Sequence, residues 1–369
     1  MTASETIDRN PKVSTLELFF DLVFVFTITQ LTGVLVDGAS AASALQVAVM
    51  LAVIWWMYDG YAWLTNAIAT DLVRYRLLLL GGMGGFLVIA LTIPNAYEGE
   101  GLDFALAYLV VVLLHAGMYA SAGTGSEVSA ILRIAPYNLA AALLVLLGGA
   151  AGGRTQDVLW IAAALLLWIT PWFASTEGFV IEARHFVERH GLVIIVALGE
   201  SIVVIGAGAV GDPIELELVV AALLALALSA SLWWLYFVDE EGVERAMVEA
   251  STTRRARLAL VGFGYWHFGL VLGVVAVAGG LKKAIGDPYD TLGTWIGIEL
   301  GVGAALFVAC TAGFAATLGL GIRPVRIVAA LLAVVTIPIG TEISASAQLG
   351  ALTTIVAGAL VAEARRFPV

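Results

Sequence analysis

Three carboxylic acids lie inside stretches of the sequence that are otherwise apolar, where they could bind a cation or carry a proton. Glu17 and Asp21 are four residues apart in the first apolar run, so a helix would place both on one face. Glu200 lies about 15 Å into a later run, close to the middle of a bilayer. A carboxylate at that depth must be protonated, paired, hydrated or bound to a cation. We therefore expect these acids to face a polar interior, with Glu200 as the strongest candidate for function.

Each of these acids also has a structural alternative. Ser14 stands three residues before Glu17, which is the pattern of a capping box, so Glu17 could serve only the start of the helix at the membrane surface. Glu200 could be a neutral side chain that is hydrogen-bonded to another helix. Asp21 lies about a turn and a half inside the span, where water is not guaranteed, and this depth favours a functional interpretation.

Further polar side chains occur inside other apolar runs, at depths that could join the same interior. They are Asp59, His115, Ser201, His267 and Glu299. The first two reach the level of Asp21 from opposite sides of the membrane, so these three could meet. Ordered by depth, the whole set outlines a path from Glu17 through Glu200 to Glu299. For each histidine the alternative is a neutral imidazole that is hydrogen-bonded between helices.

A cluster of charged and imidazole side chains precedes the run that holds Glu200. It consists of Arg184, His185, Glu188, Arg189 and His190. The cluster does not predict a metal site, because its two histidines are five residues apart and its two arginines would repel a cation. We interpret it as a cytoplasmic structural or gating segment, in which Arg189 can pair with Glu17 or Glu188.

The composition indicates which elements must position these groups. Hydrophobic residues make up 61% of the 369, charged residues only 13%, and the mean hydropathy is +0.98, which predicts an all-helical protein with many membrane spans. The net charge of −11 argues against a nucleic-acid partner. The single cysteine, Cys310, excludes an internal disulfide and a cysteine metal cluster. We find no nucleotide, nucleophile or zinc-protease motif, so we predict no cofactor and assign no catalytic residue.

Apolar runs of about twenty residues, separated by charged breaks, predict twelve spans. They lie near 16–36, 43–66, 74–94, 102–122, 131–151, 157–175, 190–210, 216–238, 256–279, 292–318, 323–341 and 345–363. An even number of spans places both ends of the chain on one side of the membrane. That side carries every Lys and Arg except Arg154, Lys282 and Lys283, so the positive-inside rule predicts that both termini are cytoplasmic.

The two halves of the chain share short motifs in the same order. Residues 54–58 (Ile-Trp-Trp-Met-Tyr) are similar to residues 232–236 (Leu-Trp-Trp-Leu-Tyr), and an Arg-Leu pair occurs near the start of both the third and the ninth predicted span. We therefore predict a parallel repeat of six plus six helices. The predicted divisions are a cytoplasmic N-terminal segment at 1–15, a first repeat at 16–175, a cytoplasmic connecting segment at 176–190 and a second repeat at 191–369. The alternative is a chance recurrence of aromatic pairs near the membrane interface.

Two blocks of this sequence are distinctive. The first is residues 18–26, Leu-Phe-Phe-Asp-Leu-Val-Phe-Val-Phe, followed by Thr29, Gln30 and Leu31; the second is His185-Phe186 with residues 188–192 and 197–202. Together they closely resemble the bacterial low temperature requirement protein A family. The resemblance implies a multi-pass protein of the bacterial cytoplasmic (inner) membrane. The family name records a growth phenotype, and the resemblance transfers no catalytic residue.

Three functions fit these observations. The leading hypothesis is a transporter or channel in the lipid bilayer for a cation or a proton-coupled small solute, with Asp21 and Glu200 as its central acids. The second is an intramembrane enzyme that modifies lipid, with Glu200 and His267 near the bound lipid as acid and base. The third is a non-catalytic sensor or assembly factor, in which the acids only hold helices together and residues 181–190 carry the activity.

Overall fold

The chain folds into helices that are joined by short connections. A computed structural model describes residues 13–67, 72–122, 125–173, 178–210 and 213–366. Within these ranges there is no β-strand, and twelve helical segments are long and apolar enough to cross a membrane. This confirms the predicted all-α polytopic class and the predicted number of spans. Most of the predicted N-terminal segment, residues 1–12, lies outside the described ranges.

The helices follow one another along the chain, and most of them cross the full bundle. They are α1 (Thr15–Gly38), α2 (Ala41–Ala67), α3 (Val73–Thr92), η1 (Ile93–Asn95), α4 (Gly101–Ala122), α5 (Gly125–Ala151), α6 (Gly153–Phe173), α7 (Ala183–Gly208), α8 (Leu216–Phe237), α9 (Glu240–Glu249), α10 (Thr252–Leu258), η2 (Ala259–Trp266), α11 (His267–Gly286), α12 (Thr294–Thr317), α13 (Pro324–Val335), α14 (Ile337–Glu342) and α15 (Ala345–Arg366).

The first helix begins and ends at residues that cap it. The Ser14 hydroxyl accepts a hydrogen bond from the Glu17 backbone N–H, and the Glu17 carboxylate accepts one from the Ser14 backbone N–H, so the expected capping box is present. At the other end Ala39 adopts a left-handed φ of 34°, and its N–H donates to the carbonyl of Leu35. The 24 residues between the caps are enough to cross the hydrocarbon core of a bilayer.

The ninth span is longer than predicted and is irregular at its centre. It was expected at 256–279, but it runs from Thr252 to Gly286 through α10, η2 and α11. The η2 segment is a π-helix, a wider form that is frequent at functional sites. His267 follows it directly, and its ring nitrogen Nδ1 donates to the carbonyl of Gly262, five residues earlier. The position of this side chain therefore depends on the π-helix.

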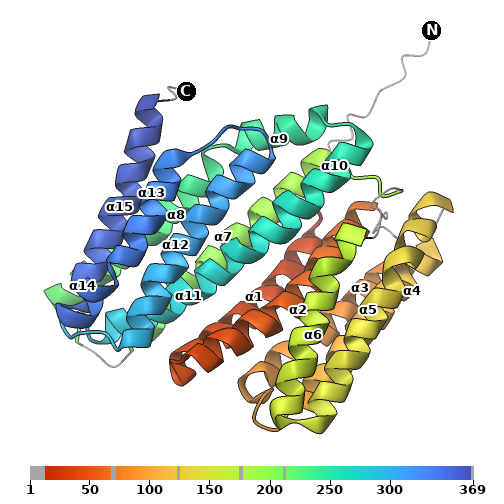
Figure 1. The fold of residues 1–369 in the computed structure, drawn as a ribbon, viewed down its shortest axis with the longest axis horizontal. Coiled ribbons are helices and arrows are strands. Elements are labelled where there is room, and N and C mark those ends of the chain that lie inside the picture. Colours follow the sequence, from red (N-terminus) through yellow and green to blue (C-terminus); the bar gives the residue numbers. More distant parts are fainter. Residues whose placement is uncertain (1–12, 68–71, 123–124, 174–177, 211–212, 367–369) are drawn as a thin grey trace.

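Two groups of helices, α1 to α6 and α7 to α15, meet along α1, α7 and α11 (Figure 1). Helix α1 packs against α2 and α3 of its own group and against α7 and α11 of the other. Figure 1 also shows that α1 begins and α15 finishes at the same end of the bundle, which we call the terminal end. Side chains on α1 can therefore meet side chains from both groups.

The packing of helices in the second group follows the same order as in the first. In the first group, α1 packs against α2 and α3, and further contacts join α3 to α4, α4 to α5, α5 to α6 and α6 to α2. In the second group, α7 packs against α8 and α11, and further contacts join α11 to α12, α12 to α13, α13 to α15 and α15 to α8. Each group thus has the same order of contacts between its spans.

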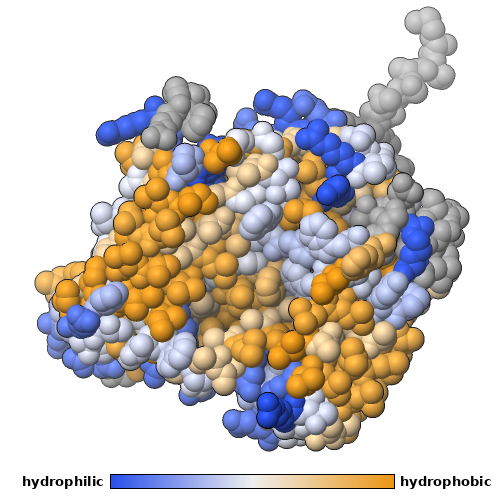
Figure 2. All heavy atoms as spheres, viewed as in Figure 1, coloured by the Kyte–Doolittle hydropathy of each residue, from blue (hydrophilic) through white to orange (hydrophobic). Residues whose placement is uncertain are grey.

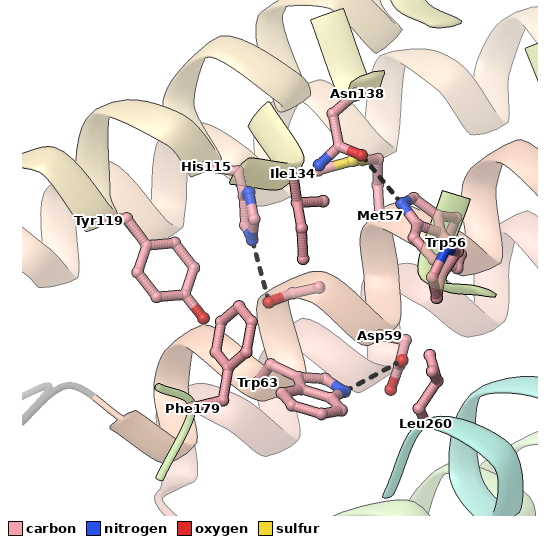
Figure 3. A pocket seen from close by; sticks show the side chains of 12 residues that line it. Trp56, Met57, Asp59, Trp63, His115, Tyr119, Ile134, Asn138, Phe179 and Leu260 are labelled. Carbon is pink, nitrogen blue, oxygen red and sulfur yellow. Dashed lines mark hydrogen bonds between the residues drawn. The ribbon is translucent and has the colours of Figure 1, made fainter. Parts of the chain in front are cut away.

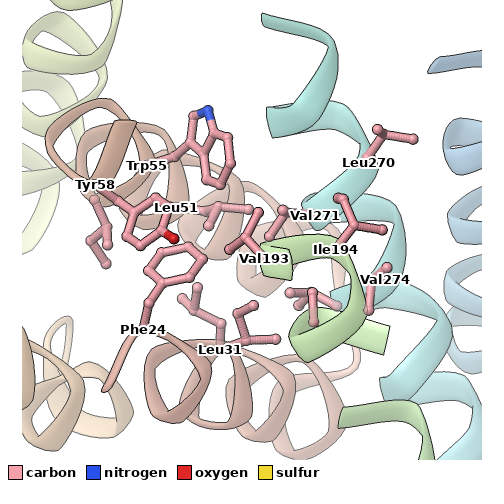
Figure 4. Close-up of a cluster of buried hydrophobic side chains, with 14 of the residues drawn as sticks. Phe24, Leu31, Leu51, Trp55, Tyr58, Val193, Ile194, Leu270, Val271 and Val274 are labelled. Atoms are coloured by element: carbon pink, nitrogen blue, oxygen red, sulfur yellow. The ribbon is translucent and has the colours of Figure 1, made fainter. Parts of the chain in front are cut away.

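Apolar side chains fill the middle of the interface between the groups. Figure 4 shows Phe24 of α1, Trp55 of α2, Ile194 of α7 and Val271 of α11 gathered at one place, and all four are fully buried or nearly so. The outer surface in view is also largely apolar, with hydrophilic side chains concentrated toward the two ends of the bundle (Figure 2). Such a surface suits contact with lipid, and the buried layer closes the space between the two groups.

Candidate functional site

Arg189 lies at the centre of a buried ionic cluster near the terminal end of the bundle. Its side chain is 1% exposed, and Nη1 donates to Glu17 Oε1 at 2.7 Å and to the hydroxyl of Thr65 at 2.5 Å. Nη2 lies 3.5 Å from Asp21 Oδ1. The expected pairing of Arg189 with Glu17 is therefore present, and one cation serves two carboxylates.

Glu17 is both a helix cap and a member of this ionic cluster. Its Oε2 accepts hydrogen bonds from the Ser14 hydroxyl at 2.8 Å and from Nε2 of His185 at 3.2 Å. The other ring nitrogen of His185, Nδ1, faces the side-chain amide of Asn66 at 3.1 Å. A neutral imidazole with its proton on Nε2 satisfies both contacts, so these contacts do not require a positive charge on His185.

Asp21 is completely buried one turn further along α1. Oδ1 accepts a hydrogen bond from the Tyr58 hydroxyl at 2.5 Å, whereas Oδ2 has no hydrogen-bond partner in the described part of the chain. The aromatic rings of Phe20 and Tyr58 lie 5.7 and 6.0 Å from the Arg189 guanidinium carbon. Asp21 therefore has an oxygen available for a proton or a cation.

A second pair, Asp59 and His190, adjoins this cluster on α2 and α7. His190 Nε2 lies 3.0 Å from Asp59 Oδ1, and Nδ1 lies 2.8 Å from the carbonyl of Phe186. Both ring nitrogens thus face oxygen acceptors, an arrangement that suits a ring protonated on both nitrogens or a proton shared with Asp59. The second oxygen of Asp59, Oδ2, accepts a hydrogen bond from Trp63 Nε1 at 3.2 Å.

His267 lies beside His190, with 5.4 Å between the ring centroids. Its Nε2 is 2.8 Å from the Tyr236 hydroxyl, and its Nδ1 donates to the carbonyl of Gly262. These contacts fit a neutral ring that accepts from Tyr236. His267 was expected near the middle of its span, and it lies near the middle of the 35 residues from Thr252 to Gly286, where its ring packs against that of His190.

Glu200 stands about ten residues, or about 15 Å, beyond His190 on α7. It is 2% exposed, and Oε2 accepts a hydrogen bond from the Thr29 hydroxyl of α1 at 2.5 Å. The next residue, Ser201, is fully buried, and its hydroxyl has no hydrogen-bond partner within the described ranges. Glu200 thus contacts α1, whereas His267 packs against His190.

Glu299 occupies the part of the interior farthest along α1. It is 6% exposed, and neither carboxyl oxygen has a hydrogen-bond partner among the described residues. A Cβ added at Gly279 of α11 would lie 3.3 Å from Oε2, 3.6 Å from Val36 and 3.7 Å from Leu35. Because Gly279 has no side chain, the carboxyl group of Glu299 has room to lie against the last turn of α1.

His115 of α4 occupies a different place from the one expected. Its Nε2 donates to the carbonyl of Gly60 at 3.0 Å. His115 and Asp59 both line a cavity of 80 Å³, shown in Figure 3, but Asp21 does not line it. The predicted meeting of these three side chains therefore does not occur. Aromatic side chains form much of the cavity wall: Trp56, Trp63, Tyr119 and Phe179.

The remaining members of the predicted cytoplasmic segment lie at the surface. Arg184 is exposed and pairs with exposed Glu244 at 2.9 Å, and exposed Glu188 accepts from the backbone N–H of Val13 at 3.4 Å. Residues 183–190 form the first two turns of α7, and residues 176–177 lie outside the described ranges. No group of three His, Cys, Asp or Glu residues that could hold a metal ion was found in the described part of the chain.

Four carboxyl groups follow one another along α1. Glu17 and Asp21 belong to it, Glu200 bonds to its residue Thr29, and Glu299 lies beside its last turn. At about 1.5 Å per residue these positions are roughly 6, 12 and 9 Å apart. The apolar layer around Phe24 and Ile194 lies between the first two acids and Glu200.

Four residues were not proposed as site residues from the sequence, although each contacts a candidate residue. They are Tyr58, Tyr236, Thr29 and Thr65. The two tyrosines could have been found, because they occupy the same place in the two Trp-Trp motifs. Thr29 was noted only as part of the family motif, and Thr65 carried no signal, since a hydroxyl inside a membrane helix commonly bonds to its own backbone.

Comparisons with known proteins identify relatives of this chain. The family model described as "Bacterial low temperature requirement A protein (LtrA)" matches residues 12–362. An uncharacterized protein of Rhizobium meliloti (strain 1021) is 32% identical over 298 residues, which cover 77% of this chain and 72% of the relative. No solved structure matches the chain. Neither description states a molecular activity, so a function must be argued from the site.

Proposed function

The chain belongs to the bacterial low temperature requirement A family, and we propose that this multi-pass membrane protein is a transporter or channel for protons or another cation, or for a small solute coupled to protons. The observation that carries the proposal is the succession of carboxyl groups along α1, from Glu17 and Asp21 to Glu200 and Glu299. Ionisable groups inside membrane proteins commonly mark ion pathways and proton relays.

The charge balance at the terminal end favours uptake of a positive charge. Glu17, Asp21 and Asp59 are three acids, whereas Arg189 is the only permanent cation in contact with them within the described ranges. Protonation of His190 supplies one more positive charge and leaves one negative charge unbalanced. A buried charge without a partner is costly, so the cluster gains stability by binding a proton.

The apolar layer at the centre of the bundle fits a protein that controls passage. Phe24, Trp55 and Ile194 separate the ionic cluster from Glu200, and all three are buried. Apolar constrictions exclude water and ions until the structure opens. A rearrangement of α1 against α7 would then connect the two polar regions, as expected for gated or alternating access.

We further propose that the two helix groups are parallel repeats and that both termini are cytoplasmic, in the bacterial inner membrane. The equivalent order of helix packing in the two groups supports the repeat. The arginines near the start of α7 and α10 and at the close of α15 lie at the terminal end, in agreement with the positive-inside rule. By this assignment Glu299 faces the outer half of the membrane.

The experiment that tests transport is ion flux into liposomes that contain the purified protein. Proton, sodium and potassium gradients are imposed in turn over a pH series, and flux is compared between the wild type, Glu200→Gln and Glu217→Gln. Glu217 is a matched control, because it is an exposed glutamate near the start of α8. We expect that flux is lost, or changes its pH dependence, in Glu200→Gln but not in Glu217→Gln.

Two other results would each overturn the proposal. Unchanged flux in folded Glu200→Gln would remove this residue from the mechanism. Absence of flux for the folded wild type under every gradient would favour a sensor or assembly factor, in which the ionic cluster serves only to hold α1, α2 and α7 together.

A further inference from the structure

We infer that the cavity between α2, α4, α5 and α6 binds a small, fully alkylated ammonium ion. The cavity has a volume of 80 Å³ and includes Asp59 and His115 in its lining (Figure 3). This inference goes beyond the proposed transport, because it concerns occupancy of a defined cavity whether or not the ligand crosses the membrane.

The cavity wall is rich in aromatic side chains that come from separate parts of the chain. Trp56 and Trp63 belong to α2, Tyr119 to α4, and Phe179 to the segment that precedes α7. Trp63 and Phe179 meet edge to face, with ring centroids 5.2 Å apart. Aromatic faces attract cations through the ring quadrupole, most strongly for Trp, and enclosures of such rings suit quaternary ammonium groups.

The charge of the lining also selects a cation. Asp59 is the acidic residue of the lining, which contains no Lys or Arg. Oδ2 of Asp59 accepts a hydrogen bond from Trp63, and Oδ1 faces Nε2 of His190. Both carboxylate oxygens are therefore engaged, and these contacts hold the carboxylate at one position. His115 directs its Nε2 proton away to the carbonyl of Gly60. Asp59 is therefore the charged group that lines the cavity, and it would repel an anion and attract an ammonium ion.

The hydrogen bonds of the lining favour an ammonium ion without N–H groups. The side-chain oxygen of Asn138 already accepts from Trp56 Nε1 at 3.0 Å, as the Asp59 oxygens do from their own partners. A primary amine would need new acceptors for its N–H donors, but a fully alkylated nitrogen needs none.

The volume of the cavity limits the size of the ligand. One water molecule needs about 10–15 Å³ by this measure of volume, so the cavity accommodates only a few heavy atoms. Tetramethylammonium, with five heavy atoms, is a probe of the appropriate size.

The test is direct binding of tetramethylammonium to the full chain, purified in a detergent without choline head groups and measured by titration calorimetry. The neutral probe is tert-butanol, which has the same number of heavy atoms and a similar shape. We expect saturable binding of the cation and binding of tert-butanol that is at least about tenfold weaker, because only the cation gains from the aromatic faces and Asp59. A phosphocholine detergent is titrated separately, and its competition with tetramethylammonium would identify a lipid head group as the natural source of the same chemistry.

Two variants locate the binding site. Trp56→Leu should weaken tetramethylammonium about 3- to 30-fold, and Asp59→Asn should weaken it at least about tenfold. The matched control is Trp234→Leu, since Trp234 holds the equivalent place in the second Trp-Trp motif but is 60% exposed and outside the cavity. Size-exclusion chromatography and thermal unfolding check that each variant is folded, and Trp56→Leu still tests the site if Asp59→Asn does not fold.

The inference is overturned if the folded wild type shows no saturable binding, if tert-butanol binds equally well, or if Trp56→Leu and Trp234→Leu bind alike. Since the readout is binding, its failure leaves the flux proposal standing, and a failure of flux leaves the binding result standing.

Discussion

Replacing Arg189 should destabilise the protein strongly, because this side chain is the cation between two buried acids. Arg189→Met keeps the apolar stem but removes the charge, leaving Glu17 and Asp21 without it. Removing one partner of a buried ion pair costs about 3–5 kcal/mol, since the other charge stays buried and uncompensated. Loss of the hydrogen bond to Thr65 acts in the same direction. We expect the free energy of unfolding to fall by about 3–5 kcal/mol.

Arg184→Met is the matched control, five residues earlier and at the start of the same helix. Its ion pair with Glu244 has side chains that are 55% and 42% exposed, and exposed pairs contribute about 0–1 kcal/mol. Both variants are measured by reversible unfolding in mixed micelles with increasing sodium dodecyl sulfate, followed by circular dichroism. Adding Glu17→Gln and Asp21→Asn to Arg189→Met should recover part of the loss, because neutral amides need no cation. Equally small losses in the two arginine variants would refute this reasoning.

Three further changes are measured in the same unfolding assay. Ser14→Ala should cost about 0.5–2 kcal/mol through loss of the α1 cap, and an unchanged stability would show that the capping box is dispensable. Tyr236→Phe should cost about 1–3 kcal/mol because it leaves Nε2 of His267 buried without its donor, and no loss would contradict that hydrogen bond. Gly279→Ala should be less stable than Gly33→Ala, because its Cβ would lie 3.3 Å from Glu299 Oε2, which would have to shift, whereas a Cβ at Gly33 meets no atom within 4 Å; the opposite order would contradict the packing.

The class of fold and the number of spans could be predicted because a bilayer imposes a length and a composition on each helix. The bounds of the ninth span were less predictable, since charged residues near its two ends remain helical, namely Arg254, Arg255, Lys282 and Lys283. The π-helix within it gives no signal in the composition. The packing of His267 against His190 could not be predicted, because one sequence does not say which helices are neighbours.

The candidate site could be predicted as a set of buried acids but not as an arrangement. Depth along a helix is one coordinate, and contact also depends on the rotation of each helix and on which helices are neighbours. Asp21 and His115 lie at similar depths yet contact different groups, Tyr58 and Gly60. The pairing of Glu17 with Arg189 could be predicted because both residues lie near the start of their helices, at the same end of the bundle.

Transport that depends on Glu200 is tested most directly by proton flux into liposomes reconstituted with the wild type, Glu200→Gln or Glu217→Gln at equal protein content. Both substitutions remove one carboxyl group, but only that of Glu200 is buried against Thr29 of α1. We expect that the wild type and Glu217→Gln conduct protons or exchange them for a cation, and that folded Glu200→Gln does not. Equal flux in all three proteins would contradict it.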